Sequence, residues 1–300
     1  MNRHLILSCF LFFIVLTACN VQSIRRPVTV PNRVQVIQNV PLTNSSDDAM
    51  VELGTRSGVT QRILLKKPAA PQANLILFAG GHGNLDLRNN GDIGWGKSNF
   101  LVRSRELFAD NGFLVALVDA PSDRKTHRGM LGGFRTSTEH AQDIAGVICY
   151  LREQAPVPVW LVGTSRGSTS AANAAIRITQ GGMEGLVLTS GITRWDERGD
   201  NLLDMLLEDI KIPTLVVHHK GDGCPDTPYR GVKDIMERLK NSSNSEHISF
   251  TGGNAPVSRP CGPKSQHGFY GIEEEVVDVI SQWIKRHLHK AKGGEFLFYL

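Results

Sequence analysis

The sequence predicts an α/β fold, with a mostly parallel sheet covered by helices on both faces and one domain. Three observations predict it. From about residue 59, short β-branched runs alternate with longer helical patterns. Several of these runs, such as residues 113–118, are continuously apolar, as burial on both faces of a sheet requires. The 300 residues, 41% apolar and 21% charged, suffice for one large α/β domain and exclude general disorder.

The N-terminus reads as a secretory signal over residues 1–18. Arg3 and His4 precede an apolar run at residues 5–16, too short for a membrane-spanning helix of about 20 residues. The run ends in Leu-Thr-Ala-Cys at residues 16–19, which resembles the lipobox of bacterial lipoproteins. The resemblance implies cleavage before Cys19, acylation of Cys19 and a membrane-anchored envelope protein, with Asn20 favouring the outer membrane. An ordinary signal followed by an incidental cysteine is the alternative.

Residues 19–49 are expected to be the lipidated N-terminus and a tether. They contain three prolines and a polar cluster at residues 44–48, with some extended structure expected around residues 34–40. The domain is expected at residues 50–292. The apolar tail at residues 293–300 has no assigned role.

The cysteines predict one disulfide. Of the five, Cys9 leaves with the signal and Cys19 carries the lipid. Cys149 lies in an apolar helical pattern, where a buried thiol packs as a small hydrophobe. In an oxidising compartment, Cys224 and Cys261 are therefore expected to pair.

Local patterns place the regular elements in chain order. Strands are predicted at residues 59–65, 74–79, 113–119, 157–162, 185–189, 213–219 and 246–251. Helices are predicted near residues 98–111, 137–154, 166–180, 228–240 and 272–289. The connection at residues 191–211 is too short for a large cap. In such sheets, ligands bind beyond the carboxyl ends of the strands.

The strongest motif is Gly-Thr-Ser-Arg-Gly at residues 163–167. An apolar strand precedes it and a helix rich in small residues follows it. This is the pattern of a nucleophile elbow, in which flanking glycines let strand and helix approach around a strained serine. Ser165 is therefore the candidate nucleophile. A glycine-rich turn with an idle serine is the alternative.

Here the chain resembles the α/β-hydrolase family, over nearly all of residues 59–290. The family places its acid in the turn after the seventh strand, which residues 212–219 match, so the resemblance implies Asp222, with Asp226 as the alternative. The family's base follows the last strand. His267, in the loop at residues 262–269, fits that place; the other late histidines, His247, His287 and His289, lie on the expected strand and final helix.

The resemblance also implies an oxyanion hole made of two backbone amides. One belongs to Arg166, the residue after the nucleophile. The second comes from the loop at residues 79–84, where Gly81 is the first choice and His82 the runner-up. The Cys224–Cys261 disulfide would then tie the acid loop to the base loop.

The resulting hypothesis is a serine hydrolase that cleaves a carboxylic ester or a related acyl bond, with a small or extended ester as substrate, and needs neither a metal nor another cofactor. A catalytically silent envelope binding or scaffolding protein is one alternative. A metal site is another, but the spacings of its candidate ligands match no tight zinc pattern. Those candidates are His218, His219, Cys224, Asp226, Cys261 and His267. Lys plus Arg exceed Asp plus Glu only by 33 to 29, without clustering, so no nucleic-acid partner is expected. The oligomeric state stays open.

Overall fold

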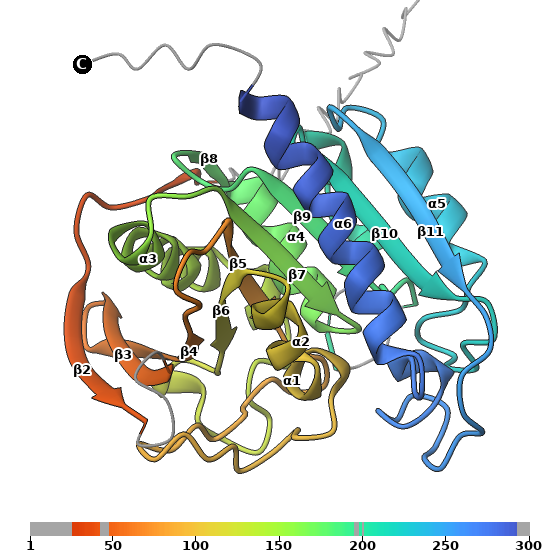
Figure 1. Cartoon of the computed structure of the whole chain (residues 1–300), viewed down its shortest axis with the longest axis horizontal. Coiled ribbons are helices and arrows are strands. Elements are labelled where there is room, and N and C mark those ends of the chain that lie inside the picture. The colour runs from red at the N-terminus through yellow and green to blue at the C-terminus, as the bar shows by residue number, and fades with distance from the viewer. Residues whose placement is uncertain (1–25, 43–47, 195–197, 200, 293–300) are drawn as a thin grey trace, which may run out of the picture.

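A nine-stranded sheet forms the centre of the protein (Figure 1). The computed structural model describes residues 26–42, 48–194, 198–199 and 201–292. The strand order is β11-β10-β9-β7-β5-β6-β4-β3-β2, and β1 pairs separately with β8. From β6 to β11 the neighbouring strands are parallel, whereas β4, β3 and β2 are added antiparallel at one side. The predicted mostly parallel α/β sheet is confirmed.

The elements have the following bounds. The strands are β1 (Val28–Thr29), β2 (Gln35–Pro41), β3 (Asp48–Arg56), β4 (Val59–Lys66), β5 (Ala73–Phe78), β6 (Phe113–Val118), β7 (Val159–Thr164), β8 (Ile178–Gln180), β9 (Gly185–Thr189), β10 (Thr214–His219) and β11 (Ser245–Phe250). The α-helices are α1 (Phe100–Arg103), α2 (Arg105–Asp110), α3 (Thr138–Gln154), α4 (Gly167–Arg177), α5 (Gly231–Arg238) and α6 (Glu273–Lys292). Short 3₁₀ turns are η1 (Ser122–Arg124), η2 (Phe134–Thr136), η3 (Leu202–Asp204), η4 (Leu207–Asp209) and η5 (Gln266–Gly268).

Two apolar cores lie on opposite faces of the sheet. Helices α3, α4 and α5 supply one core, and α1, α2 and α6 supply the other, with α6 crossing the sheet in Figure 1. Strand β5 shows why its sequence is apolar throughout. Its side chains alternate between the two cores, Leu75 and Leu77 on one side, Ile76 and Phe78 on the other, and all are buried.

The segment predicted to be a tether is instead partly in the sheets. Within residues 19–49, β1 pairs with β8, and β2 pairs with β3 along the edge of the large sheet. Strand β2 leaves most of its side chains exposed, because an edge strand is held largely by backbone hydrogen bonds to its neighbour. The extended structure expected around residues 34–40 is strand β2. The segment is nevertheless not only a tether, because β1 and β2 are paired into the sheets.

Two helix predictions also need correction. The predicted helix at residues 98–111 is broken at Ser104 into α1 and α2. The predicted helix at residues 166–180 ends at Arg177, because Ile178–Gln180 forms β8 beside β1. The end of α4 coincides with the pairing of β8 with β1, a tertiary neighbour that the local pattern does not contain.

The predicted signal, the lipidation residue Cys19, Asn20 and the apolar tail at residues 293–300 lie outside the described residues. Among the helices described, none is long and apolar enough to span a membrane.

Candidate active site

Ser165 lies in a sharp turn between β7 and α4. Its backbone is in the left-handed region, with φ of 51°, and its side chain is partly exposed. A Cβ on Gly163 would lie 2.4 Å from the carbonyl oxygen of Gly167, and one on Gly167 would lie 2.0 Å from that of Phe78. Both positions therefore need glycine. This is the strained strand-turn-helix geometry that presents a serine at the end of a strand.

Asp222 and His267 come together from distant loops. Asp222 follows β10, and its carboxylate is fully buried. His267 lies in η5 with its Nδ1 3.0 Å from Asp222 Oδ2, and the Cys224 amide donates to Asp222 Oδ1 at 2.9 Å. The carboxylate thus holds the imidazole through Nδ1, leaving Nε2 as the ring atom able to accept a proton.

Two residues that sequence reasoning missed complete this contact. The Thr227 hydroxyl donates to Asp222 Oδ2 at 2.9 Å and lies 3.0 Å from His267 Nδ1. His218 Nε2 lies 3.1 Å from Asp222 Oδ2 and 2.9 Å from the Thr227 carbonyl oxygen. Because a carbonyl only accepts, His218 Nε2 must carry a proton. No local signal distinguishes Thr227, and His218 was weighed only as a metal ligand.

These donors set the charge of Asp222. Burial alone would raise the pKa of this carboxyl, but hydrogen bonds from His218 and His267, the charge of His267 and the Cys224 amide hold it well below its usual value. A carboxylate that receives this many hydrogen bonds stays ionised and fixed in orientation.

The loop that carries His267 is itself held at both sides. The Ser190 hydroxyl donates to the His267 carbonyl oxygen at 2.8 Å. Arg103, at the end of α1, donates to the Gly268 carbonyl oxygen at 2.6 Å and pairs with Glu273 at the start of α6 at 2.7 Å. The break between α1 and α2 therefore lies beside an arginine that positions the base loop.

Ser165 and His267 line the same pocket, whose volume is about 490 Å³. Within the described part of the chain, the Ser165 hydroxyl makes no hydrogen bond. In a protein without substrate, the hydrogen bond between a catalytic serine and its histidine is often too long, and it shortens only when substrate binds. The Ser165–His267 proton transfer therefore stays a prediction.

The loop after β5, which is expected to hold a backbone donor, lies beside Ser165. A Cβ on Gly80 would lie 3.0 Å from Ser165 Cβ, so this loop passes directly over the serine. Gly81 lines the pocket with φ of 61°, and its N–H has no acceptor among the described residues. His82 does not line that pocket; its ring stacks on Trp95 at a centroid distance of 3.7 Å.

Arg135 holds the loop after β5 by hydrogen bonds to two of its carbonyl oxygens. Its guanidinium donates to the carbonyl oxygens of Ala79 at 3.0 Å and Gly81 at 3.2 Å. Burial, together with the charge of Arg166, lowers the pKa of Arg135 to about 9. Turning the Gly81 carbonyl toward Arg135 fixes the peptide planes of the loop. Arg135 is a further residue that the sequence did not single out.

No family model matches the sequence, and no curated protein matches it. Solved structures do match. A serine hydrolase without a lid from Xanthomonas campestris is 15% identical with a TM-score of 0.51, covering 86% of this chain and 97% of that one. An esterase from Pyrococcus furiosus is 15% identical with a TM-score of 0.57, covering 80% and 93%.

A cold-adapted esterase from an Arctic intertidal metagenomic library is 14% identical with a TM-score of 0.52, covering 79% of this chain and 95% of that one. The chain has the α/β-hydrolase fold. At these identities, the likeness concerns the fold.

Within the α/β-hydrolase fold, the candidate residues gather where ligands bind in such sheets. Gly81, Ser165 and Asp222 follow the carboxyl ends of β5, β7 and β10. The connection between β9 and β10 contains, in its described part, only the short turns η3 and η4. The expectation of a fold without a large cap fits this connection.

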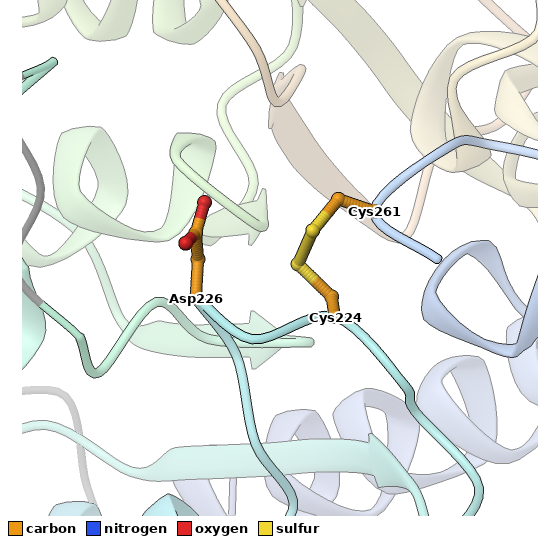
Figure 2. Close-up of side chains that lie close together, drawn as sticks. All are labelled: Cys224, Asp226 and Cys261. Atoms are coloured by element: carbon orange, nitrogen blue, oxygen red, sulfur yellow. A yellow bond between two sulfur atoms is a disulfide. The ribbon is translucent and has the colours of Figure 1, made fainter. Parts of the chain in front are cut away.

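A disulfide joins Cys224 to Cys261, with an S–S distance of 2.03 Å, and links the acid loop to the base loop (Figure 2). Cys149 is free and buried. Asp226, the alternative acid, lies beside this disulfide. Its carboxylate contacts Arg198 at 3.1 Å and Arg166 at 3.7 Å.

The sulfur atoms and the Asp226 carboxylate lie within 4.8 Å of one another, which resembles a metal-binding group. The two sulfurs are bonded to each other, however, and a disulfide does not supply the thiolates that metal sites use. The two cysteines of this cluster therefore join the acid and base loops covalently and are not metal ligands.

Proposed function

We propose that the protein is a serine hydrolase that cleaves a carboxylic ester through an acyl-enzyme on Ser165. One observation carries the proposal. A strained serine at the end of β7 shares a pocket with a histidine whose Nδ1 contacts a buried, ionised carboxylate at 3.0 Å. This combination of nucleophile, base and orienting acid is what acyl transfer requires.

In the first half of the reaction, Ser165 Oγ attacks the ester carbonyl carbon and its proton passes to His267 Nε2. The carbonyl π electrons move to the oxygen, and the amides of Gly81 and Arg166 would donate to that oxyanion. When the intermediate collapses, the bond to the alcohol breaks. His267 Nε2 returns its proton to the leaving alkoxide, and the acyl group stays on Ser165.

In the second half, His267 takes a proton from a water molecule whose oxygen attacks the acyl carbon. The bond to Ser165 Oγ then breaks, and the serine recovers the proton from Nε2. Asp222 and Thr227 keep the proton on His267 Nδ1 directed away from the substrate throughout.

The decisive experiment is labelling with a fluorophosphonate probe. The wild-type protein is expected to be labelled at Ser165, and Ser165→Ala should lose labelling and turnover of short-chain aryl esters. Ser57→Ala is the control, since Ser57 is exposed in the turn between β3 and β4 and does not line the pocket. Persistent labelling of Ser165→Ala would place the nucleophile elsewhere.

A second candidate is a binding or scaffolding protein that keeps this fold without turnover. The observation that favours it is the Ser165 hydroxyl, which lacks a hydrogen bond within the described part of the chain. A panel of short-chain aryl esters separates the two candidates. An unlabelled Ser165 together with no turnover would support the silent protein.

We further propose that the protein is exported and anchored to a bacterial envelope membrane through acylated Cys19. The support is the sequence at residues 5–19, an apolar run ending in Leu-Thr-Ala-Cys. The disulfide between Cys224 and Cys261 suits an oxidising compartment.

A further inference from the structure

The pocket that contains Ser165 carries positive charge without a balancing acid. Lys97 and Arg259 line it, and neither makes an ion pair with any described residue. No aspartate or glutamate is among the described residues of its lining. Both cationic side chains are exposed. An anion that enters this pocket is attracted to two cations and repelled by no lining carboxylate.

The pocket is also rich in hydrogen-bond donors close to the serine. The Asn99 Oδ1 accepts from the Leu101 amide at 3.2 Å, which fixes the orientation of the side-chain amide. Its Nδ2 has no acceptor among the described residues and lies 3.4 Å from the place where a Gly80 Cβ would stand, beside Ser165. With the free Gly81 N–H, this makes two donors facing the reaction site and awaiting acceptor atoms.

Backbone contacts place the two cations at fixed points of the pocket wall. The Arg259 carbonyl oxygen accepts from the Gly262 amide at 2.7 Å, and Cys261 is tied by its disulfide to Cys224. Lys97 lies in a turn closed by the bond from the Asn99 amide to the Gly96 carbonyl oxygen at 2.8 Å. Only the side chains need to order when an anion binds, which lowers the entropy cost of recognition.

We propose that the substrate is a small ester that carries a second, anionic group, a carboxylate, bound by Lys97 and Arg259 while its ester carbonyl lies at Ser165. This inference rests on the proposed hydrolase function. Ser165, His267 and Asp222 would act on the ester group of any substrate. Lys97 and Arg259 would select substrates that carry a negative charge.

The test compares esters of equal size and different charge. The 4-nitrophenyl monoester of succinic acid places a carboxylate on the acyl group, and 4-nitrophenyl valerate is its neutral counterpart. The acetyl ester of 4-hydroxybenzoate, compared with methyl 4-acetoxybenzoate, places the charge on the leaving group instead. At low salt, the wild-type protein should show a higher kcat/KM for the anionic member of at least one pair. Raising the ionic strength should weaken that preference.

The variant Lys97→Gln/Arg259→Gln should lower kcat/KM for the preferred anionic ester about tenfold, the effect available from two partly exposed ion pairs. Turnover of the neutral ester should change little. The matched control is Lys233→Gln/Lys240→Gln, which removes the same charge from two exposed lysines outside the pocket lining. It should leave the anionic preference intact.

A binding measurement separates this inference from the proposed function. Monomethyl succinate, or 4-acetoxybenzoate where that pair is preferred, should bind to Ser165→Ala more tightly than its neutral analogue, and the Lys97→Gln/Arg259→Gln change should abolish the difference. If the protein turned over no ester but still bound the anionic analogue more tightly, the hydrolase proposal would be wrong and the anion-binding pocket would stand. Equal kcat/KM values for both members of both pairs, or equal losses in the two double variants, would overturn the anionic substrate.

Discussion

At the scale of single residues, the candidate site depends on geometry that a few side chains enforce. Ser165 is held at a positive φ that only its neighbouring glycines make room for. Asp222 receives hydrogen bonds from two histidines, a threonine and an amide, so its charge is stabilised although it is buried. The orientation of the His267 ring, the proposed base, therefore depends on the residues around Asp222 as much as on Asp222 itself.

Thr227 offers the clearest test of that idea. The substitution Thr227→Val removes the hydrogen bond to Asp222 and the contact with His267 Nδ1, while the side-chain volume changes little. We expect kcat for an ester to fall about tenfold with a smaller change in KM, because the loss affects orientation of the base and not the pocket lining.

Steady-state kinetics across a range of pH checks this expectation. Thr227→Ser keeps the hydroxyl and should recover most of the activity, and the shape of the pH profile should change only in the valine variant. Unaltered kcat and pH profile in Thr227→Val would show that the hydroxyl has no positioning role.

At the scale of elements, two loops far apart in sequence form one unit. The acid loop follows β10, the base loop follows β11, and the Cys224–Cys261 disulfide closes a separation of 37 residues between them. Helix α1 adds a second tie through Arg103, whose guanidinium reaches both the base loop and α6. The early end of α4 belongs to the same scale, since it occurs where β8 pairs with β1.

The disulfide should contribute to both stability and activity. Closing a loop of this length corresponds to about 4 kcal/mol in a chain-entropy treatment. We therefore expect Cys224→Ala/Cys261→Ala to unfold at lower denaturant concentration and to show a lower kcat, because the acid and base loops are no longer joined.

Denaturant unfolding and kinetics under non-reducing conditions measure both effects. Cys149→Ala is the control, since Cys149 is a free buried thiol outside these loops and its replacement should preserve the link and its sensitivity to reductant. Stability and kcat that match the wild type in the double variant would refute a role for the link in holding the two loops.

At the scale of the whole molecule, the sheet begins much earlier than the predicted domain boundary. Strands β1, β2 and β3 carry the chain from Val28 into both sheets. Val28 is nine residues after Cys19, so a fully extended connection would span at most about 30 Å. An anchor at Cys19 would therefore keep the catalytic body close to the membrane surface.

The anchor itself is tested by replacing its acceptor. Cys19→Ala should abolish incorporation of an alkyne-labelled fatty acid and move the protein from the membrane fraction to the aqueous fraction of bacterial cells. Cys9→Ala changes the other cysteine of the N-terminal segment and should leave both properties unchanged. Continued fatty-acid labelling of Cys19→Ala would exclude Cys19 as the anchor.

The sequence by itself determined the features whose physical cause is local. Continuous apolar runs predicted the strands buried on both faces, and Gly-Thr-Ser-Arg-Gly predicted the turn that strains Ser165, because both follow from neighbouring residues. Asp222 and His267 were chosen by resemblance, from their order in the chain.

Only the tertiary structure decided what surrounds them. Arg135 became part of the site because folding brings it to the loop after β5, 54 residues away in the chain. His218 and Thr227 are only four and five residues from Asp222, but the path of the chain after β10 is what directs their side chains to its carboxylate. The sequence indicated extended structure around residues 34–40, but only the pairing with β3 places this strand at the edge of the large sheet. Contacts between segments far apart in the chain have no local signature, so these features were fixed by folding.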